Sequence, residues 1–147
     1  MKRIIFVLML ALAFVACKKE EANENDRYFP IFYPNAISCL DNAGMTLEIK
    51  SDRPSEFGYA VIAKDEEKNV DRSHYHYETE NDRYRITQID EYTYQLTIKP
   101  FVEKDRIVFY FFNPKNTYRP GYIVVTCGYE LTGPVKEYLD NMHNLDN

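Results

Sequence analysis

The sequence lacks the residue patterns that mark the common enzyme classes. Its five glycines form neither a phosphate-binding loop nor a dinucleotide-binding fingerprint, and no serine stands in a Gly-x-Ser-x-Gly motif. There is no Cys-x-x-Cys pair. Acidic residues are abundant, but a sequence gives no separation between carboxylates, so no pair is singled out for acid–base work. We therefore expect no catalytic residues, no cofactor and no enzymatic activity.

Positive charge is also scarce, since 18 Lys and Arg residues stand against 23 Asp and Glu residues. The net charge is −5. Nucleic acid binding depends on a basic surface, so we expect no nucleic acid partner. The sequence leaves the oligomeric state open.

Long apolar runs are absent except at the amino terminus, where Met1-Lys2-Arg3 precedes an apolar run over residues 4–16. A positive start and an apolar core of this length are typical of a secretory signal peptide, whereas a membrane-spanning helix needs ~20 apolar residues. We expect residues 1–16 to be a signal peptide that is removed. Small Ala16 lies directly before Cys17, where a processing peptidase requires a small side chain.

The stretch Leu12-Ala13-Phe14-Val15-Ala16-Cys17 resembles the lipobox of bacterial lipoproteins, although Phe14 replaces the usual aliphatic residue. The resemblance implies that Cys17 becomes the amino terminus and carries a thioether-linked diacylglycerol, often with a third acyl chain on its amine. Each buried CH₂ contributes ~0.8 kcal/mol, so two or more chains anchor a protein stably. The alternative is an ordinary secretory signal with Cys17 as a chance neighbour.

Residues 17–27 are expected to form the lipidated amino terminus and a flexible linker. After Cys17 this stretch is rich in charged and amide residues and has no aromatic or β-branched residue. Its start, Lys18-Lys19-Glu20-Glu21, resembles the Lys-acid-acid export signal of Bacteroidota surface lipoproteins. The resemblance implies display on the outer face of the outer membrane, with the periplasmic face as the alternative.

Residues 28–147 predict a single β-rich domain. Aromatic residues make up 15% of the chain and include 13 tyrosines, although there is no tryptophan. Tyr, Phe, Val, Ile and Thr all favour strands. Loss of the signal peptide removes Lys2 and Arg3 and moves the net charge to about −7, so the domain is acidic.

Alternation of apolar and polar residues predicts eight or nine short strands, of which 92–99 is the clearest, with Tyr94, Leu96 and Ile98 facing inward. The other predicted strands cover residues 28–34, 36–40, 45–50, 57–63, 73–79, 84–89, 106–112 and 122–129.

Two connections between strands and one helix can also be predicted. Residues 36–40 and 45–50 are expected to form a hairpin about a turn at 41–44. The apolar segments 106–112 and 122–129 are expected to be neighbouring central strands joined by a loop over 113–121. Gly133-Pro134 is expected to open a short helix with Val135, Leu139 and Met142 on its apolar stripe.

The spacing of strands and turns predicts an all-β fold, an immunoglobulin-like antiparallel β-sandwich of about 7–9 strands with a short C-terminal helix. A small eight-strand β-barrel is the alternative. Residues 116–125, with Asn116, Arg119 and Gly121 before an alternating Ile/Val strand, resemble the approach to the final strand of Bacteroidota immunoglobulin-like modules. That resemblance implies the fold and assigns no function.

Cys39 and Cys127 remain once Cys17 carries lipid. An exported compartment permits disulfides, so a cross-sheet bridge is one possibility. It would close a loop of about 88 residues, which corresponds to roughly 4–5 kcal/mol in the chain-entropy model. The alternative is two buried free thiols that act as small apolar residues.

His74, His76 and Glu78 alternate along the predicted strand 73–79 and would share one face. That spacing could hold a metal such as zinc. The simpler interpretation is a solvated face, with Tyr75 and Tyr77 as the core contacts on the other side, and we expect no bound metal.

The tyrosines could form a platform for sugar rings, because Tyr stacks on a sugar with its face and hydrogen-bonds at its edge. Tyr28, Tyr33, Tyr92 and Tyr118 lie near predicted turns and are the candidates for exposure. The alternative is that the rings fill the core with their hydroxyls at the rim.

The function expected from the sequence is a membrane-anchored, surface-exposed lipoprotein that serves as a non-enzymatic binding or envelope-assembly module for an unknown protein or glycan. One alternative is a carbohydrate-binding accessory lipoprotein of a glycan-uptake system. The other is a small hydrolase-inhibitor lipoprotein.

Overall fold

The computed structural model describes residues 29–142. The predicted signal peptide, Cys17, the linker over 17–27 and Tyr28 therefore lie outside the described residues, as do residues 143–147. Among the residues described, no helix is long and apolar enough to cross a membrane.

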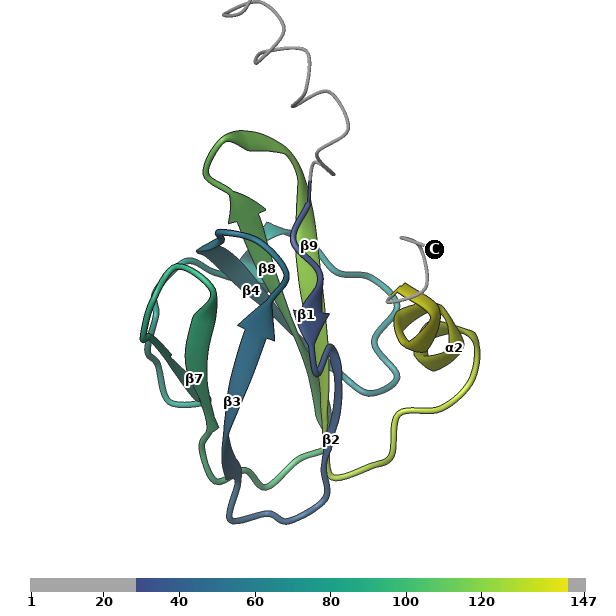
Figure 1. Cartoon of the computed structure of the whole chain (residues 1–147). Coiled ribbons are helices and arrows are strands. Elements are labelled where there is room, and N and C mark those ends of the chain that lie inside the picture. Colours follow the sequence, from purple (N-terminus) through teal and green to yellow (C-terminus); the bar gives the residue numbers. More distant parts are fainter. Residues whose placement is uncertain (1–28, 143–147) are drawn as a thin grey trace, which may run out of the picture.

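The described chain folds into two β-sheets and one α-helix (Figure 1). The elements in chain order are β1 (Phe32–Tyr33), β2 (Ala36–Cys39), β3 (Met45–Ser51), β4 (Glu56–Lys64), a 3₁₀ turn η1 (Arg72–His74), β5 (Tyr75–His76), β6 (Tyr84–Gln88), β7 (Thr93–Ile98), β8 (Asp105–Asn113), β9 (Asn116–Cys127) and α2 (Pro134–Asn141).

One sheet has four strands in the order β1-β3-β7-β6, and the other has five in the order β2-β9-β8-β4-β5. The predicted β-sandwich with a short C-terminal helix is confirmed, with two separate sheets in place of a closed barrel. The predicted neighbours β8 and β9 are paired, in antiparallel orientation, and β6 pairs with β7 in the same way.

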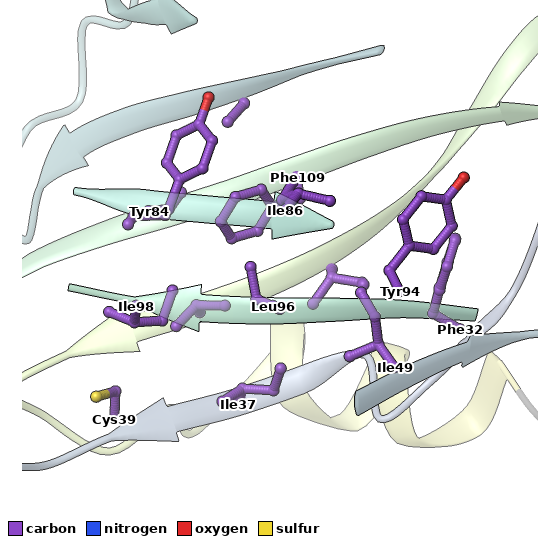
Figure 2. Close-up of a cluster of buried hydrophobic side chains, with 14 of the residues drawn as sticks. Phe32, Ile37, Cys39, Ile49, Tyr84, Ile86, Tyr94, Leu96, Ile98 and Phe109 are labelled. Carbon is purple, nitrogen blue, oxygen red and sulfur yellow. The ribbon is translucent and has the colours of Figure 1, made fainter. Parts of the chain in front are cut away.

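The core lies between the sheets and is formed by every second residue of the facing strands (Figure 2). Ile107, Phe109 and Phe111 of β8 are fully buried, and the Tyr84 ring meets the Phe109 ring edge-on with their centroids 5.0 Å apart. Tyr94 is buried, as the alternation in 92–99 predicts. Full burial of such side chains contributes ~1.5–3 kcal/mol each, so this cluster dominates the stability of the fold.

Strand β2 departs from the prediction, because it joins β9 in a parallel pair and lies in a different sheet from β3. The turn after β2 therefore crosses between the sheets and does not close a hairpin. It ends at Gly44, whose φ is 86° and where a Cβ would overlap the carbonyl oxygen of Ile98. Only glycine allows the chain to pass the end of β7 this closely.

The predicted loop over residues 113–121 is also wrong, since β9 already begins at Asn116 and a two-residue turn links it to β8. Pro120 is the reason that the sequence predicts a loop here, because proline is unusual inside a strand. A proline cannot donate to a strand ladder, but it is tolerated where the pairing is irregular. The register of β8 and β9 shifts opposite this stretch, between Phe111 and Asn113.

The strand predicted over 73–79 is mostly absent. Asp71 accepts a hydrogen bond from the backbone N–H of Ser73 and caps the 3₁₀ turn η1. Only Tyr75 and His76 then pair with β4. The side-chain bond from Asp71 favours the turn over an extended chain, and so the predicted alternation ends here.

Helix α2 packs on the outer face of the five-stranded sheet, on the side away from the four-stranded sheet. Leu139 and Met142 are buried against Val124 of β9 and Leu131. Val135 departs from the predicted stripe and is 50% exposed.

The side-chain amide of Asn35 ties the helix down, because it donates to the Leu139 carbonyl at 3.0 Å. The helix therefore covers the β2–β9 side of the outer face. The β8, β4 and β5 side stays open.

Candidate functional site

Four tyrosines cross the outer face of the five-stranded sheet, one from each of four neighbouring strands, from the open side to the edge of the part that α2 covers. We call this set, made up of Tyr75 (β5), Tyr59 (β4), Tyr110 (β8) and Tyr122 (β9), the tyrosine row. Register pairs Tyr59 with Tyr110 and Tyr110 with Tyr122. Strand pairing thus brings together residues that are far apart in sequence.

The rings of the row stand side by side. The Tyr59 and Tyr110 centroids are 4.7 Å apart with 19° between the ring planes, and those of Tyr59 and Tyr75 are 5.1 Å apart with 8°. These distances match the ~4.7–4.9 Å spacing of neighbouring strands. Both faces of Tyr59 are therefore covered by other rings, and the row presents ring edges and hydroxyls to solvent.

Tyr122 ends the row in a different orientation. Its ring is tilted by 42° from that of Tyr110, with the centroids 6.0 Å apart, so its face is not closed by a parallel neighbour on that side. At the other end, Tyr77 is 67% exposed and tilted by 45° from Tyr59. Tyr122 is partly buried against the cluster beneath α2, so the exposed aromatic ring lies beside the other end of the row, at Tyr77.

Burial raises the pKa of the Tyr59 and Tyr110 hydroxyls, and the neighbouring phenols of the row raise it further. Burial likewise raises the pKa of Tyr122. All three groups stay protonated at neutral pH, so each offers one hydrogen-bond donor and also accepts.

A groove of about 620 Å³ lies where the row meets the part of the chain that leads to α2. Val108, Tyr110, Tyr122 and Val124 of the sheet line it on one side, and residues 129–132 with Val135 line it on the other. This volume lies within the range of ~300–1,000 Å³ typical of small-molecule sites.

Arg106 of β8 and Asp65 supply charged groups to the groove. Arg106 is half-buried, and within residues 29–142 its side chain forms neither an ion pair nor a hydrogen bond. Burial, followed by the neighbouring Asp65 carboxylate, raises the pKa of Tyr129 to about 12. Arg106 acts in the opposite direction on Tyr129, so the two groups lie close to the same hydroxyl.

A second cavity, of about 580 Å³, lies beside the start of β8 and contains Arg83, Asp105, Glu67 and His74. Its charged groups pair mainly with one another. Arg83 forms a two-pronged ion pair with the buried Asp105, and His74 Nε2 lies 2.8 Å from Glu67 Oε1. This cavity is thus less suited to a charged ligand than the groove beside Arg106.

The predicted metal candidates do not share one face. His74 lies in η1 and contacts Glu67 and Asp71, whereas His76 Nδ1 lies 3.2 Å from Glu78. In the described part of the chain, no three His, Cys, Asp or Glu residues come together as a metal site would require. The face-sharing hypothesis is wrong because the 3₁₀ turn interrupts the strand.

Cys39 and Cys127 are both buried and carry free thiols. They are paired residues of the neighbouring strands β2 and β9, within one sheet, so the predicted cross-sheet placement is wrong. Burial raises the pKa of both thiols, and that of Cys127 rises to about 12.

Sequence analysis identified the exposed tyrosines near turns but missed the tyrosine row. Tyr33, Tyr92 and Tyr118 are exposed as predicted. Tyr75 and Tyr77, expected in the core, lie on the outer side with Tyr59. The row has no local signal, since it arises only from the order of the strands.

Comparison with known proteins identifies no family, because no family model and no curated protein sequence match the chain. Two solved structures share a similar arrangement at low similarity. One is a chain from a structure on T cell specificity and activation by the bacterial superantigen toxic shock syndrome toxin-1, with 10% identity, a TM-score of 0.43, and 69% of this chain and 98% of that chain covered. The other is murine CRIg, with 9% identity, a TM-score of 0.40, and coverage of 67% and 95%. Neither bears on the ligand.

Proposed function

We propose that the protein is a lipid-anchored, non-enzymatic binding module of the bacterial outer membrane, and that its ligand binds on the open outer face of the five-stranded sheet. The observation that carries this proposal is the tyrosine row, which leads from β5 across β4 and β8 into the groove beside Tyr122. The anchor at Cys17 and display at the cell surface rest on the lipobox and on Lys18 to Glu21.

A binding role explains why aromatic side chains occupy a face that water reaches. Tyrosine gives a large, rigid contact area with a polar tip at low cost in side-chain entropy, and it is enriched in binding surfaces. The core already has its own aromatic residues, such as Tyr84 and Phe109. The tyrosine row is therefore not needed to fill the core between the sheets.

A second candidate, an accessory protein of a glycan-uptake system, is favoured by the lining of the groove. Tyr110 and Tyr122 stand there beside Arg106, Asp65 and Thr132. Sugar rings place their C–H faces on aromatic rings and their hydroxyls on charged and amide groups. A protein partner would engage the row through its hydroxyl edges instead.

The anchor is tested by Cys17→Ala. This variant should be exported, folded and recovered in the soluble envelope fraction, whereas the wild-type protein should sediment with outer membranes and partition into detergent. Surface labelling of intact cells then distinguishes the outer from the periplasmic face. Recovery of the variant in the membrane fraction would contradict the anchor.

The binding face is tested with the soluble Cys17→Ala protein and further substitutions in it. Fluorescently labelled protein should bind isolated envelope polysaccharide or an envelope protein fraction, and Tyr122→Ala should lower that binding. Tyr92→Ala, at an exposed tyrosine in the turn before β7 of the other sheet, is the matched control and should bind normally. Equal binding by all three proteins would exclude the outer face as the site.

A further inference from the structure

The guanidinium of Arg106 is the unusual group in the groove. It projects from the outer side of β8, two residues from Val108 and four from Tyr110, which also line the groove. Its partners across the sheet are Ala63 and Thr126, which carry no charge. Among residues 29–142 it forms no direct ion pair, although Asp65 and Glu130 line the same groove, whereas most other half-buried cations of the fold are paired, such as Arg83 with Asp105.

A half-buried cation that forms no ion pair within the protein is suited to bind an anionic group of a ligand. Arginine presents five N–H donors in a planar fork that matches a carboxylate in two-pronged geometry. Such a pair is stronger in a groove than in open water, because nearby protein atoms lower the effective dielectric constant. The structure therefore favours a ligand that brings one negative charge to Arg106.

The rest of the groove indicates what carries this charge. Tyr122 contributes a partly buried aromatic ring beside the apolar floor of Val108 and Val124. Asp65 and Glu130 accept hydrogen bonds and repel further negative charge. A sugar ring satisfies all three conditions, since it has an apolar C–H face, several hydroxyl donors and room for a single carboxylate.

The charge of the whole chain limits the ligand further. The net charge, about −7 once Lys2 and Arg3 are removed with the signal peptide, repels a polyanion at long range, so a chain with a carboxylate on every residue would associate poorly. We propose that the groove binds an otherwise uncharged glycan at a residue that carries one carboxylate, an acidic sugar, with Arg106 as its counter-ion. This inference rests on the proposed binding function of the same face.

The experiment compares two oligosaccharides that differ only in the terminal residue, glucuronate or glucose, by titration calorimetry with the Cys17→Ala protein. The glucuronate-terminated probe should bind at least about tenfold more tightly, and more weakly as NaCl is raised. Arg106→Gln should abolish the preference without changing the affinity for the glucose-terminated probe. Arg85→Gln, at an exposed position of β6 in the other sheet, should preserve it.

Each other outcome overturns the inference. Equal affinity for the two probes, or a preference that survives Arg106→Gln, shows that Arg106 is not the counter-ion. The outer face would still be the binding site if Tyr122→Ala weakens binding. Absence of binding to both probes at millimolar concentration excludes the acidic sugar. A peptide with a free C-terminal carboxylate is the third probe, and binding of this probe alone assigns Arg106 to a protein partner. The envelope-binding test with Tyr122→Ala judges the proposed function separately.

Discussion

Cys39 and Cys127 stand directly opposite one another in the parallel pair of β2 and β9, and both side chains point into the sandwich interior. Figure 2 shows Cys39 at the edge of the buried cluster, beyond Ile37 on the same strand. Residues 129–132, which line the groove, follow almost directly after Cys127. A covalent bond between the two cysteines would therefore join β2 to the segment that leads into the wall of the groove.

We predict that the exported protein contains a Cys39–Cys127 disulfide. Neighbouring strands lie about 4.8 Å apart, which is within the ~4.4–6.8 Å Cα separation that a disulfide allows. In forming the bond, the two thiols lose their protons and pass two electrons to the disulfide oxidant of the exported compartment. A digest without reductant should contain one peptide pair that joins the two cysteines and separates on reduction.

The same residues predict that the bond forms during folding. Burial raises the pKa of Cys127 to about 12, next to the Asp105 carboxylate, so little thiolate exists in the folded protein at neutral pH. Protein folded in a reducing cytosol should therefore stay reduced when later exposed to oxidised glutathione. Exported protein that takes up two alkyl groups in denaturant without reductant would contradict the bridge.

A second prediction concerns the ion pair of Arg83 with Asp105. The Asp105 side chain is 8% exposed and the Arg83 side chain 19%, and the guanidinium lies 5.7 Å above the Phe101 ring centroid. Arg83→Ala leaves a buried carboxylate without its partner, so unfolding in urea should show a loss of roughly 3–5 kcal/mol. Replacing both residues, as Arg83→Met with Asp105→Leu, should recover most of that loss.

The matched control is Lys64→Ala at the same cavity. The Lys64–Glu103 pair is exposed on both sides, and an exposed pair contributes ~0.2–1 kcal/mol. A similar loss of stability for Lys64→Ala and Arg83→Ala would show that burial of the Arg83–Asp105 pair does not increase the cost of breaking it.

The strands were predictable where one face is buried. In 92–99, packing requires an apolar residue at every second position, and the sequence shows this alternation at Tyr94, Leu96 and Ile98. Residues 106–112 are apolar at consecutive positions, which predicted a central strand. Partner strands leave no such record. Nothing local distinguishes β2 as a parallel neighbour of β9 from β2 as a hairpin partner of β3, because the turn at Gly44 suits both.

The candidate site was less predictable than the fold for the same reason. Tyr59, Tyr110 and Tyr122 each look like ordinary strand residues, and their proximity depends on a strand order that only the folded chain provides. The absence of an ion pair at Arg106 likewise depends on which residues surround it in the folded chain. Sequence analysis could identify tyrosine as the relevant residue type, but not which tyrosines meet.

A third prediction concerns Gly121 in β9, which passes against the chain before β1. A Cβ at this position would overlap the carbonyl oxygen of Pro30. Gly121→Ala should therefore force the two segments apart and lower the free energy of unfolding by roughly 1–3 kcal/mol. Thr117→Ala, at an exposed position of the same strand, is the control and should leave the unfolding midpoint unchanged.

The last prediction concerns the pH dependence of stability at Glu80. Hydrogen bonds from Arg85 and Lys99 lower the pKa of this carboxyl from 4.5 to about 2. A carboxyl with a depressed pKa in the folded state stabilises the fold above its unfolded-state value, and this contribution is lost as pH falls through the folded-state value. The stabilisation should therefore be complete above about pH 5 and absent below about pH 2.

The measurement is urea unfolding of the wild-type protein and of Glu80→Gln at several pH values. The wild-type protein should be the more stable at pH 6, and the difference should shrink steadily between pH 4.5 and pH 2. Salt should reduce the difference at pH 6, because Glu80, Arg85 and Lys99 all reach solvent. Glu103→Gln is the control, and its difference should be small at each pH. A constant difference between wild-type and Glu80→Gln would show that the carboxylate charge does not stabilise the fold, and that the amide acts on packing alone.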